Sequence, residues 1–171
     1  MIAIVGSCCT RGIEGDLVQV EVDVSPGLPG FYICGLPDTA VRESKDRVRA
    51  AIKNSGFNFP MRRITVNLAP ADIKKIGSHF DLPIAIGILA ASEQLPLSSL
   101  NEIYMLGELS LQGEIRRSSG VLSMALGLQK RMPGTTLVIS PENSAEAALA
   151  QEISITAPNT LAELAQSLQT G

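Results

Sequence analysis

The chain has 171 residues, of which 45% are hydrophobic and 18% charged, a composition typical of a globular protein. Its length suits one domain that buries about 70% of the surface exposed in the unfolded chain. Its formal net charge is −3, so the whole-chain charge gives no reason to expect nucleic-acid binding. The cysteines Cys8, Cys9 and Cys34 form no Cys-x-x-Cys pair, which argues against a disulfide framework and against a zinc site.

Alternating valines mark the clearest predicted strand, Leu17–Ser25. Valine occupies every second position from Val18 to Val24, and polar residues occupy the positions between, so one face should be buried and the other solvated. A turn rich in Pro and Gly then leads into a short apolar strand, Phe31–Cys34. The apolar N-terminal stretch Met1–Cys8 is expected to be a further strand of the same sheet.

A helix is predicted next, capped by Asp38, continuing to about Ser55 and ended by Gly56. Basic residues follow one another along it at spacings of 3, 4 and 4, which places them on one face. The apolar stripe of this helix consists of Val41, Val48 and Ile52, and the basic face beside it consists of Arg42, Lys45, Arg49 and Lys53.

The middle of the chain predicts a strand and a buried helix. Arg63–Leu68 alternates again, so its aliphatic side chains should point inward. A polar loop, Lys74–His79, separates this strand from a nearly all-apolar helix that ends near Ala91. Asp81 is predicted to cap that helix, which is apolar enough to be central and buried.

The second half predicts alternating strands and helices. The expected elements are a hairpin of Ile103–Leu111 with Glu114–Arg117, a helix Val121–Met132, a buried strand Thr136–Ile139, a helix opened by Ser140-Pro141-Glu142, a strand Ile153–Thr156 and a helix Thr160–Leu168. No internal repeat or low-complexity linker interrupts them. We therefore expect a single domain of the α/β or α+β class.

Two features predict a cytoplasmic protein without a membrane partner. The first basic residue is Arg11, so the charged n-region of a signal peptide is missing. The longest apolar run, Leu82–Ala91, is much shorter than the roughly 20 residues that cross a bilayer.

Charge is distributed unevenly along the chain. Nine of the 14 basic residues lie between Arg42 and Lys75, whereas the segment from Met132 to Gly171 has four glutamates and no basic residue. Two interpretations stay open for the basic middle: a solvated face in which Asp46 pairs with Arg42 or Arg49, or a surface for a phosphate backbone. The candidate nucleic-acid-binding residues are Arg42, Lys45, Arg49, Lys53, Arg62, Arg63, Lys74 and Lys75.

No complete catalytic or metal site is evident. A phosphate-binding Gly-x-x-x-x-Gly-Lys-Ser/Thr loop is absent, and a chain with one histidine, His79, cannot build a multi-histidine metal site. Ser78 is adjacent to His79, so the two are poorly placed for a catalytic triad. A pair of Ser78 with Lys74 or Lys75 is conceivable, but two lysines in a polar loop are expected to be hydrated and to keep a high pKa.

Several long motifs resemble the N-terminal domain of the ComM/YifB family, the magnesium-chelatase-like AAA+ ATPases. The motifs are Ser25–Gly30, Gly35–Ser44, Asn54–Phe57, Arg62–Asp72 and Phe80–Ala85. That domain is similar to the proteolytic domain of Lon protease and to the C-terminal domain of RadA. The resemblance implies a mixed α/β (α+β) fold of the ribosomal protein S5 domain 2 type.

The resemblance to Lon also implies where a serine–lysine dyad would lie. The serine position corresponds to His79, or to Ser78 after a one-residue slip, and the lysine position corresponds to Leu122. An aliphatic side chain cannot accept a proton from serine. We therefore expect a degenerate dyad and no catalytic residue in this chain.

The family implies a role within a larger assembly. Its full-length members resemble hexameric, ATP-driven helicases that promote branch migration of recombining DNA during natural transformation. We expect residues 1–157 to form the core of the domain and 158–171 to lead toward an AAA+ module outside this sequence, which would hold ATP and magnesium. The implied partners are single-stranded or branched DNA and other copies of the protein, with no small-molecule substrate. A scaffold for oligomerisation or protein binding, and a degenerate peptidase, are the alternatives.

Overall fold

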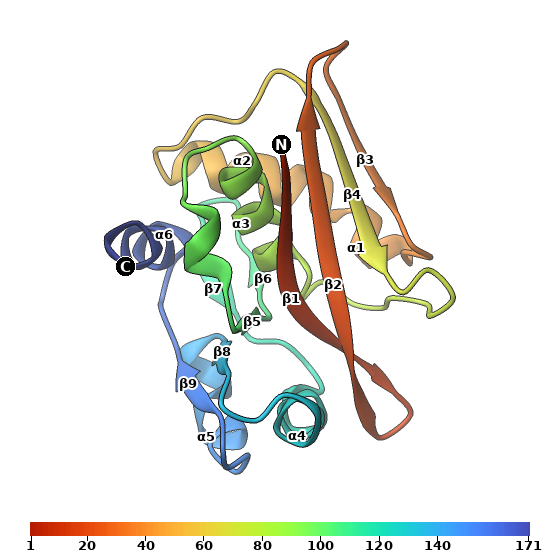
Figure 1. Cartoon of the computed structure of the whole chain (residues 1–171), viewed down its shortest axis with the longest axis vertical. Helices are drawn as coiled ribbons and strands as arrows, with labels where there is room; N and C mark the ends of the chain where they lie inside the picture. The colour runs from red at the N-terminus through yellow and green to blue at the C-terminus, as the bar shows by residue number, and fades with distance from the viewer.

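A seven-stranded mixed sheet with the order β3-β4-β2-β1-β5-β8-β9 lies at the centre of the computed structural model, which describes residues 1–171 (Figure 1). The strands of this sheet are β1 (Ile2–Arg11), β2 (Glu14–Ser25), β3 (Gly30–Cys34), β4 (Arg63–Ala69), β5 (Ile103–Met105), β8 (Thr136–Val138) and β9 (Ser154–Thr156). A separate two-stranded sheet pairs β6 (Glu108–Leu109) with β7 (Ile115–Arg116). The pairings of β2 with β1 and β4 are antiparallel, and the other pairings in the large sheet are parallel.

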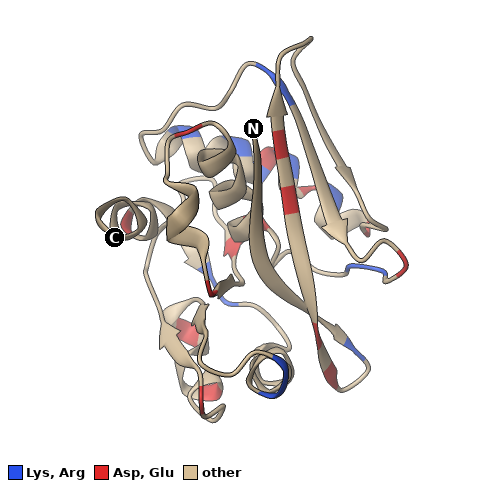
Figure 2. Ribbon diagram, in the orientation of Figure 1, with Lys and Arg blue, Asp and Glu red and all other residues tan.

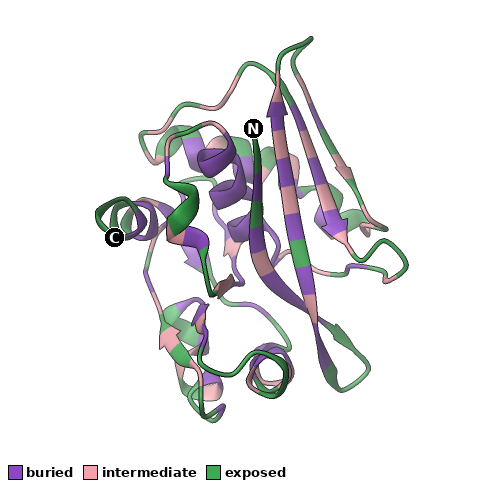
Figure 3. Ribbon diagram, viewed as in Figure 1, coloured by how far each residue is buried: buried purple, intermediate pink, exposed green.

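Helices cover both faces of this sheet. They are α1 (Thr39–Arg42), α2 (Ser44–Asn54), α3 (Asp81–Ala91), α4 (Val121–Arg131), α5 (Ser144–Ala147) and α6 (Leu161–Thr170), with 3₁₀ turns at Leu97–Leu100 and Pro141–Asn143. Every residue of α3 is buried (Figure 3), as its nearly all-apolar sequence predicts. The predicted mixed α/β fold is confirmed. None of the helices is long and apolar enough to cross a membrane.

The alternating valines of β2 are buried as predicted, and they pack in the main hydrophobic cluster with α3. The neighbouring Cys8 and Cys9 show the two faces of the sheet. Cys9 belongs to the main cluster, whereas Cys8 belongs to a second cluster with Met124 and Leu128 of α4. Because successive side chains of a strand point to opposite faces, α3 and α4 lie on opposite sides of β1 and β2.

Close contact between α4 and β2 depends on two glycines. A Cβ atom on Gly15 would lie 2.3 Å from the carbonyl oxygen of Ser123, and one on Gly127 would lie 2.4 Å from the carbonyl oxygen of Gly15. These distances leave no room for a side chain. Gly15 and Gly127 therefore allow the backbones of helix and strand to touch, as glycine often does where two elements pack closely.

The structure corrects the predicted continuity of one helix and the predicted start of another. Asp38 does cap a helix, since its Oδ1 accepts a hydrogen bond from the Val41 N–H at 2.8 Å, but the helix breaks at Glu43 into α1 and α2. Asp81 is not the cap of α3 but its first residue, and its side chain bonds to groups outside the helix. Both differences involve the same contact, because Ser44 and Arg47 in the first turn of α2 donate hydrogen bonds to Asp81.

The C-terminal half follows the predicted order with shorter elements. The predicted strand Ile103–Leu111 divides into β5 of the large sheet and β6 of the small one, and the helix after Ser140 is a 3₁₀ turn followed by α5. Thr160 caps α6 by accepting from the Glu163 N–H at 3.1 Å. The apolar face of α6 joins the main hydrophobic cluster through Leu161, Leu164, Ala165 and Leu168.

Candidate functional site

A basic groove lies between α2 and the segment that precedes β4. Its volume is about 320 Å³, and its lining residues are Pro29, Gly30, Arg49, Lys53, Phe59, Pro60, Met61 and Arg62. Arg49 and Lys53 come from successive turns of α2, as their spacing predicts. Arg62 comes from the segment between α2 and β4, so the fold adds to the groove a positive charge that the helix alone would not provide.

Two arginines of this region pack against aromatic rings. The guanidinium of Arg49 lies 5.2 Å from the ring centroid of Phe59, and that of Arg63 lies 4.7 Å from the ring centroid of Tyr32. Both are cation–π distances. The predicted pairs of Asp46 with Arg42 or Arg49 do not form, because no ion pair within 4.0 Å involves Asp46.

Other members of the predicted basic set lie apart from the groove. Arg42 is on α1 and Lys45 is one turn before Arg49 on α2. Figure 2 shows basic segments, in blue, along α2. Lys74 follows the C-terminal end of β4, whereas Arg63 begins that strand. The seven residues of β4 span about 20 Å at the usual rise per residue, and Lys74 lies beyond the end opposite Arg63. The structure therefore supports one local surface and not a continuous stripe.

The prediction that Lys75 is hydrated is wrong. Lys75 is fully buried, and its ammonium donates to the carbonyl oxygens of Gly35, at 2.8 Å, and of Pro70. Burial lowers the pKa of Lys75 from its ordinary value because a low dielectric disfavours the charged form. Lys75 is thus a structural cation that joins the corner after β3 to the loop after β4, and it is not available to a phosphate backbone.

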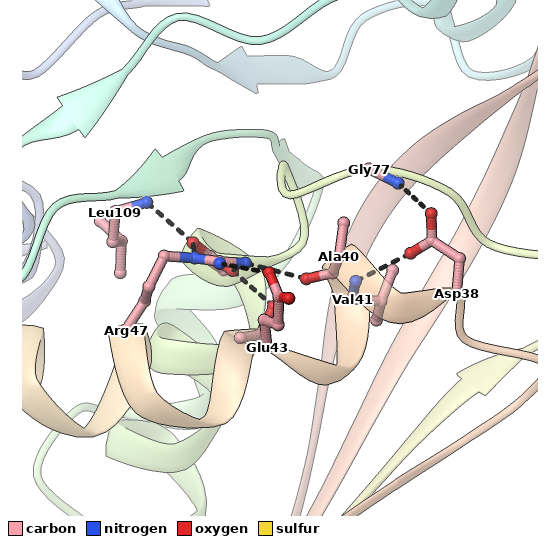
Figure 4. A network of polar contacts seen from close by, with 9 residues as sticks. Asp38, Ala40, Val41, Glu43, Arg47, Gly77 and Leu109 are labelled. Carbon is pink, nitrogen blue, oxygen red and sulfur yellow. Dashed lines mark hydrogen bonds and ion pairs between the residues drawn. The ribbon is translucent and has the colours of Figure 1, made fainter.

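A buried polar network attaches α2 to the core (Figure 4). The fully buried carboxylate of Asp81 accepts from Ser44 Oγ at 2.5 Å, from Arg47 Nε at 2.6 Å and from the Leu109 N–H at 3.0 Å. Arg47 also donates to the Ala40 carbonyl at 2.9 Å. This network fixes the rotation of α2, and so determines that Arg49 and Lys53 face the groove.

The two charged partners of this network have shifted pKa values. Burial raises the pKa of Asp81, against the lowering effect of the hydrogen bonds from Arg47 and Ser44. The hydrogen bond to Asp81 raises the pKa of Arg47, so the guanidinium keeps its charge. Nothing in the sequence around Asp81 distinguishes this role from helix capping.

Ser78 and His79, the residues at the expected serine position of the dyad, line a second pocket, of about 270 Å³. It is lined by Thr10, Ile76, Gly77, Ser78, His79, Arg117, Ser118, Ser119, Gly120 and Met124. Leu122 lies in the first turn of α4, next to this pocket but not in its lining. Ser78 makes no side-chain hydrogen bond to a lysine, because Lys75 is bound to Gly35 and Pro70 and Lys74 is exposed.

His79 is held as a neutral side chain. It is 7% exposed, its Nε2 lies 2.8 Å from the Cys8 carbonyl, and its ring lies 4.1 Å from that of Phe80. Since a carbonyl can only accept, Nε2 carries the proton. Burial lowers the pKa of His79 from its ordinary 6.5 by disfavouring the imidazolium ion.

Acidification is expected to destabilise the chain through His79. The pKa of His79 is lower in the folded state than in the unfolded state, so the unfolded state takes up a proton first as the pH falls below about 6.5. The free energy of unfolding then decreases by up to about 1.4 kcal/mol per pH unit until the pH reaches the pKa of the folded state. Urea unfolding at pH 7.5 and pH 5.5 should show this loss in the wild type and a smaller loss in His79→Gln. Parallel losses in the two proteins would contradict the assignment.

The comparisons with known proteins agree with this architecture. The family model described as subunit ChlI of Mg-chelatase matches residues 20–143. The chain belongs to this family. It is 46% identical over 167 residues to the competence protein ComM of Haemophilus influenzae, an alignment that covers 98% of this chain and 32% of the relative. The ComM/YifB resemblance stated from the motifs is confirmed.

Two further relatives extend the comparison. The chain is 45% identical over 148 residues to the uncharacterized protein YifB of Escherichia coli, covering 86% of this chain and 29% of the relative. It is 26% identical over 136 residues to a Lon protease of Mesomycoplasma hyopneumoniae, and this alignment covers 76% of this chain and 15% of the relative. The chain therefore spans about a third of the length of ComM and YifB.

Proposed function

We propose that this chain is a non-catalytic, Lon-like domain of a larger competence-related AAA+ protein, and that its basic groove contacts DNA. The groove carries the proposal, because three exposed cations, Arg49, Lys53 and Arg62, line one concave surface without a carboxylate partner. Such a surface suits a phosphate backbone. Met61 in the same lining is 77% exposed and offers apolar surface to unstacked bases, which favours single-stranded or branched DNA.

The proposed assembly is a hexamer that drives branch migration as an ATP-dependent helicase. Six copies of the groove around a ring would bind DNA more tightly than one copy, because linked sites act at high effective concentration. ATP and magnesium belong to an AAA+ module outside this sequence. The strand conformation of Gly30–Cys34 supports this placement, because Gly30 to Gly35 is the nearest match in the sequence to a phosphate-binding loop.

A salt titration of DNA binding tests the proposal. Fluorescence anisotropy with a single-stranded oligonucleotide measures the binding constant at several salt concentrations. The logarithm of the binding constant should fall linearly with the logarithm of the salt concentration, with a slope of about −0.7 for each phosphate contacted. Three groove cations thus predict a slope near −2. Absence of binding at about 20 mM salt, where the electrostatic attraction is strongest, would contradict DNA contact by this domain.

The absence of catalysis is part of the proposal. It is supported by the position of Ser78, which has no lysine or histidine as a hydrogen-bonded base, and by the aliphatic side chain of Leu122. A serine-reactive fluorophosphonate probe is expected to leave Ser78 unlabelled. Stoichiometric labelling of Ser78 would instead favour a degenerate peptidase.

The open part of the outer sheet face favours a second candidate, a scaffold for protein binding. On β1, Ile2 and Ile4 are 61% and 50% exposed, and their partners on β2 are Asp23 and Glu21. An exposed apolar pair beside acidic residues suits a protein partner. This candidate predicts that Ile2→Ser and Ile4→Ser weaken oligomerisation of the full-length protein while DNA affinity stays unchanged.

A further inference from the structure

Tyr32 is the one aromatic residue of the chain that the fold leaves exposed. The chain has four phenylalanines, two tyrosines and no tryptophan. Tyr32 is 48% exposed. The other five aromatic residues are buried or half-buried, and these are Phe31, Phe57, Phe59, Phe80 and Tyr104. Aromatic rings are enriched in binding surfaces, so the exposed ring is a candidate contact for a ligand.

The fold places this ring on the outer face of an edge strand. Tyr32 is at the middle of β3, which pairs only with β4 in the large sheet (Figure 1). Its neighbour Phe31 belongs to the main hydrophobic cluster, so Tyr32 points to the opposite face of the sheet. On that face α4 packs against β1 and β2, and Tyr32 lies on the part that the helix leaves open.

The ring leans toward the basic groove. Gly30 leaves room for it, because a Cβ atom on Gly30 would lie 2.7 Å from Cε2 and 2.8 Å from the hydroxyl oxygen of Tyr32. Gly30 also lines the groove, and it is two residues, about 7 Å, from Tyr32 along β3. The ring therefore lies beside the end of the strand at which the groove cations are found.

Two consecutive arginines connect the ring with the groove. Arg62 lines the groove, and Arg63, the register partner of Gly30 on β4, places its guanidinium 4.7 Å from the ring centroid of Tyr32. Both arginines are exposed and have no carboxylate within 4.0 Å. The ring stays 48% exposed with Arg63 in contact. A phosphate backbone that follows the two cations would thus pass beside an open aromatic surface.

Carboxylates on β2 limit the direction of such a backbone. Asp23 lies in the same cross-strand row as Tyr32, with Thr65 of β4 between them. Since adjacent strands are about 4.8 Å apart, β2 and β3 are separated by about 10 Å. Asp23 and Glu21, which share this face of β2, would repel phosphate. A strand bound to the two arginines is therefore expected to stay near β3 and β4.

We propose that Tyr32 is a base-stacking residue for single-stranded DNA at the mouth of the basic groove. The inference rests on the proposed function and adds an exposed aromatic ring to the phosphate-binding cations. Stacking on aromatic side chains holds the bases of single strands with little regard to sequence, because every base has a π face. The bases of a duplex are already stacked on one another, so Tyr32 favours a single strand over a duplex.

Tyrosine fluorescence measures this contact, because the chain has no tryptophan and two tyrosines. In Tyr104→Phe, Tyr32 is the remaining tyrosine, and a single-stranded oligonucleotide should quench its emission. An oligomer of the same length with abasic sugars keeps the phosphates but should not quench. The Tyr32→Phe protein, in which Tyr104 emits, corrects for light absorbed by the bases and should show no quenching beyond that absorption.

Competition against a labelled oligonucleotide measures the affinity that the bases add. The wild type should bind the normal strand about tenfold more tightly than the abasic strand, a usual effect of stacking one base on an aromatic ring. Tyr32→Ala should lose most of this advantage, and Tyr32→Phe should keep it because the ring and not the hydroxyl stacks. A purely structural role of Tyr32 would instead lower the affinity for both strands alike.

The possible results separate this inference from DNA binding by the groove. If the wild type binds both strands equally, or if Tyr32→Ala keeps the full advantage of the normal strand, the stacking proposal is wrong while phosphate binding by the groove stands. If neither strand binds at about 20 mM salt, both proposals fail. Leu36→Ala is the matched control. Leu36 is 52% exposed beyond the other end of β3, so its truncation should leave the advantage of the normal strand unchanged.

Discussion

Replacing Asp81 with alanine is expected to lower the free energy of unfolding by about 3–5 kcal/mol, the usual cost of removing one partner of a buried ion pair. The carboxylate is fully buried and accepts hydrogen bonds from Ser44, Arg47 and the Leu109 N–H. Its removal leaves these donors without an acceptor, including a guanidinium that is 20% exposed. Urea denaturation at pH 7 measures the loss.

A double variant provides the control for Asp81. The loss of stability in Asp81→Ala is expected to come from polar groups left without a partner, and not from lost side-chain volume. In that case, Arg47→Met combined with Asp81→Leu should lower the free energy of unfolding by less than the sum of the single changes. Apolar replacement of a whole buried pair is often close to neutral, so we expect a coupling energy of at least about 1 kcal/mol. Additive effects of the two changes would contradict the interpretation of Asp81 as the centre of the network.

Local pattern was enough to predict most of the elements. The alternating valines of β2 and the all-apolar sequence of α3 each allow one arrangement, because any other would expose a continuous apolar surface. The breaking of the helix at Glu43 could not be predicted in this way. Ser44, the first residue after the break, bonds to Asp81, which is 37 residues away in the sequence, and single-sequence patterns carry no information about such pairings.

The same limit explains which site residues were predicted. The spacing of Arg49 and Lys53 places them on one helical face whatever the tertiary structure. Lys75 has the local sequence of a hydrated loop lysine, and only the fold brings the carbonyl oxygens of Gly35 and Pro70 to its ammonium.

Reversing the charge of the groove is expected to have the largest effect on binding. The triple variant Arg49→Glu, Lys53→Glu, Arg62→Glu should weaken single-stranded DNA binding roughly 100-fold at low salt and bring the salt slope close to zero, because each lost phosphate contact removes about 0.7 from the slope. The three side chains are exposed, so the fold should be retained. Anisotropy titrations at four salt concentrations measure both quantities.

A control with the same change in net charge decides whether the position of the charges matters. Lys74, Arg116 and Lys130 are also exposed and lie outside the groove lining, so reversing them changes the net charge equally. If the groove binds DNA, this control loses only the weak long-range attraction of the whole protein, which is screened beyond about 10 Å at 0.1 M salt, and its slope stays near that of the wild type. Equal losses in the two variants would mean that the domain attracts DNA only through its overall charge, and the groove would then have no special role.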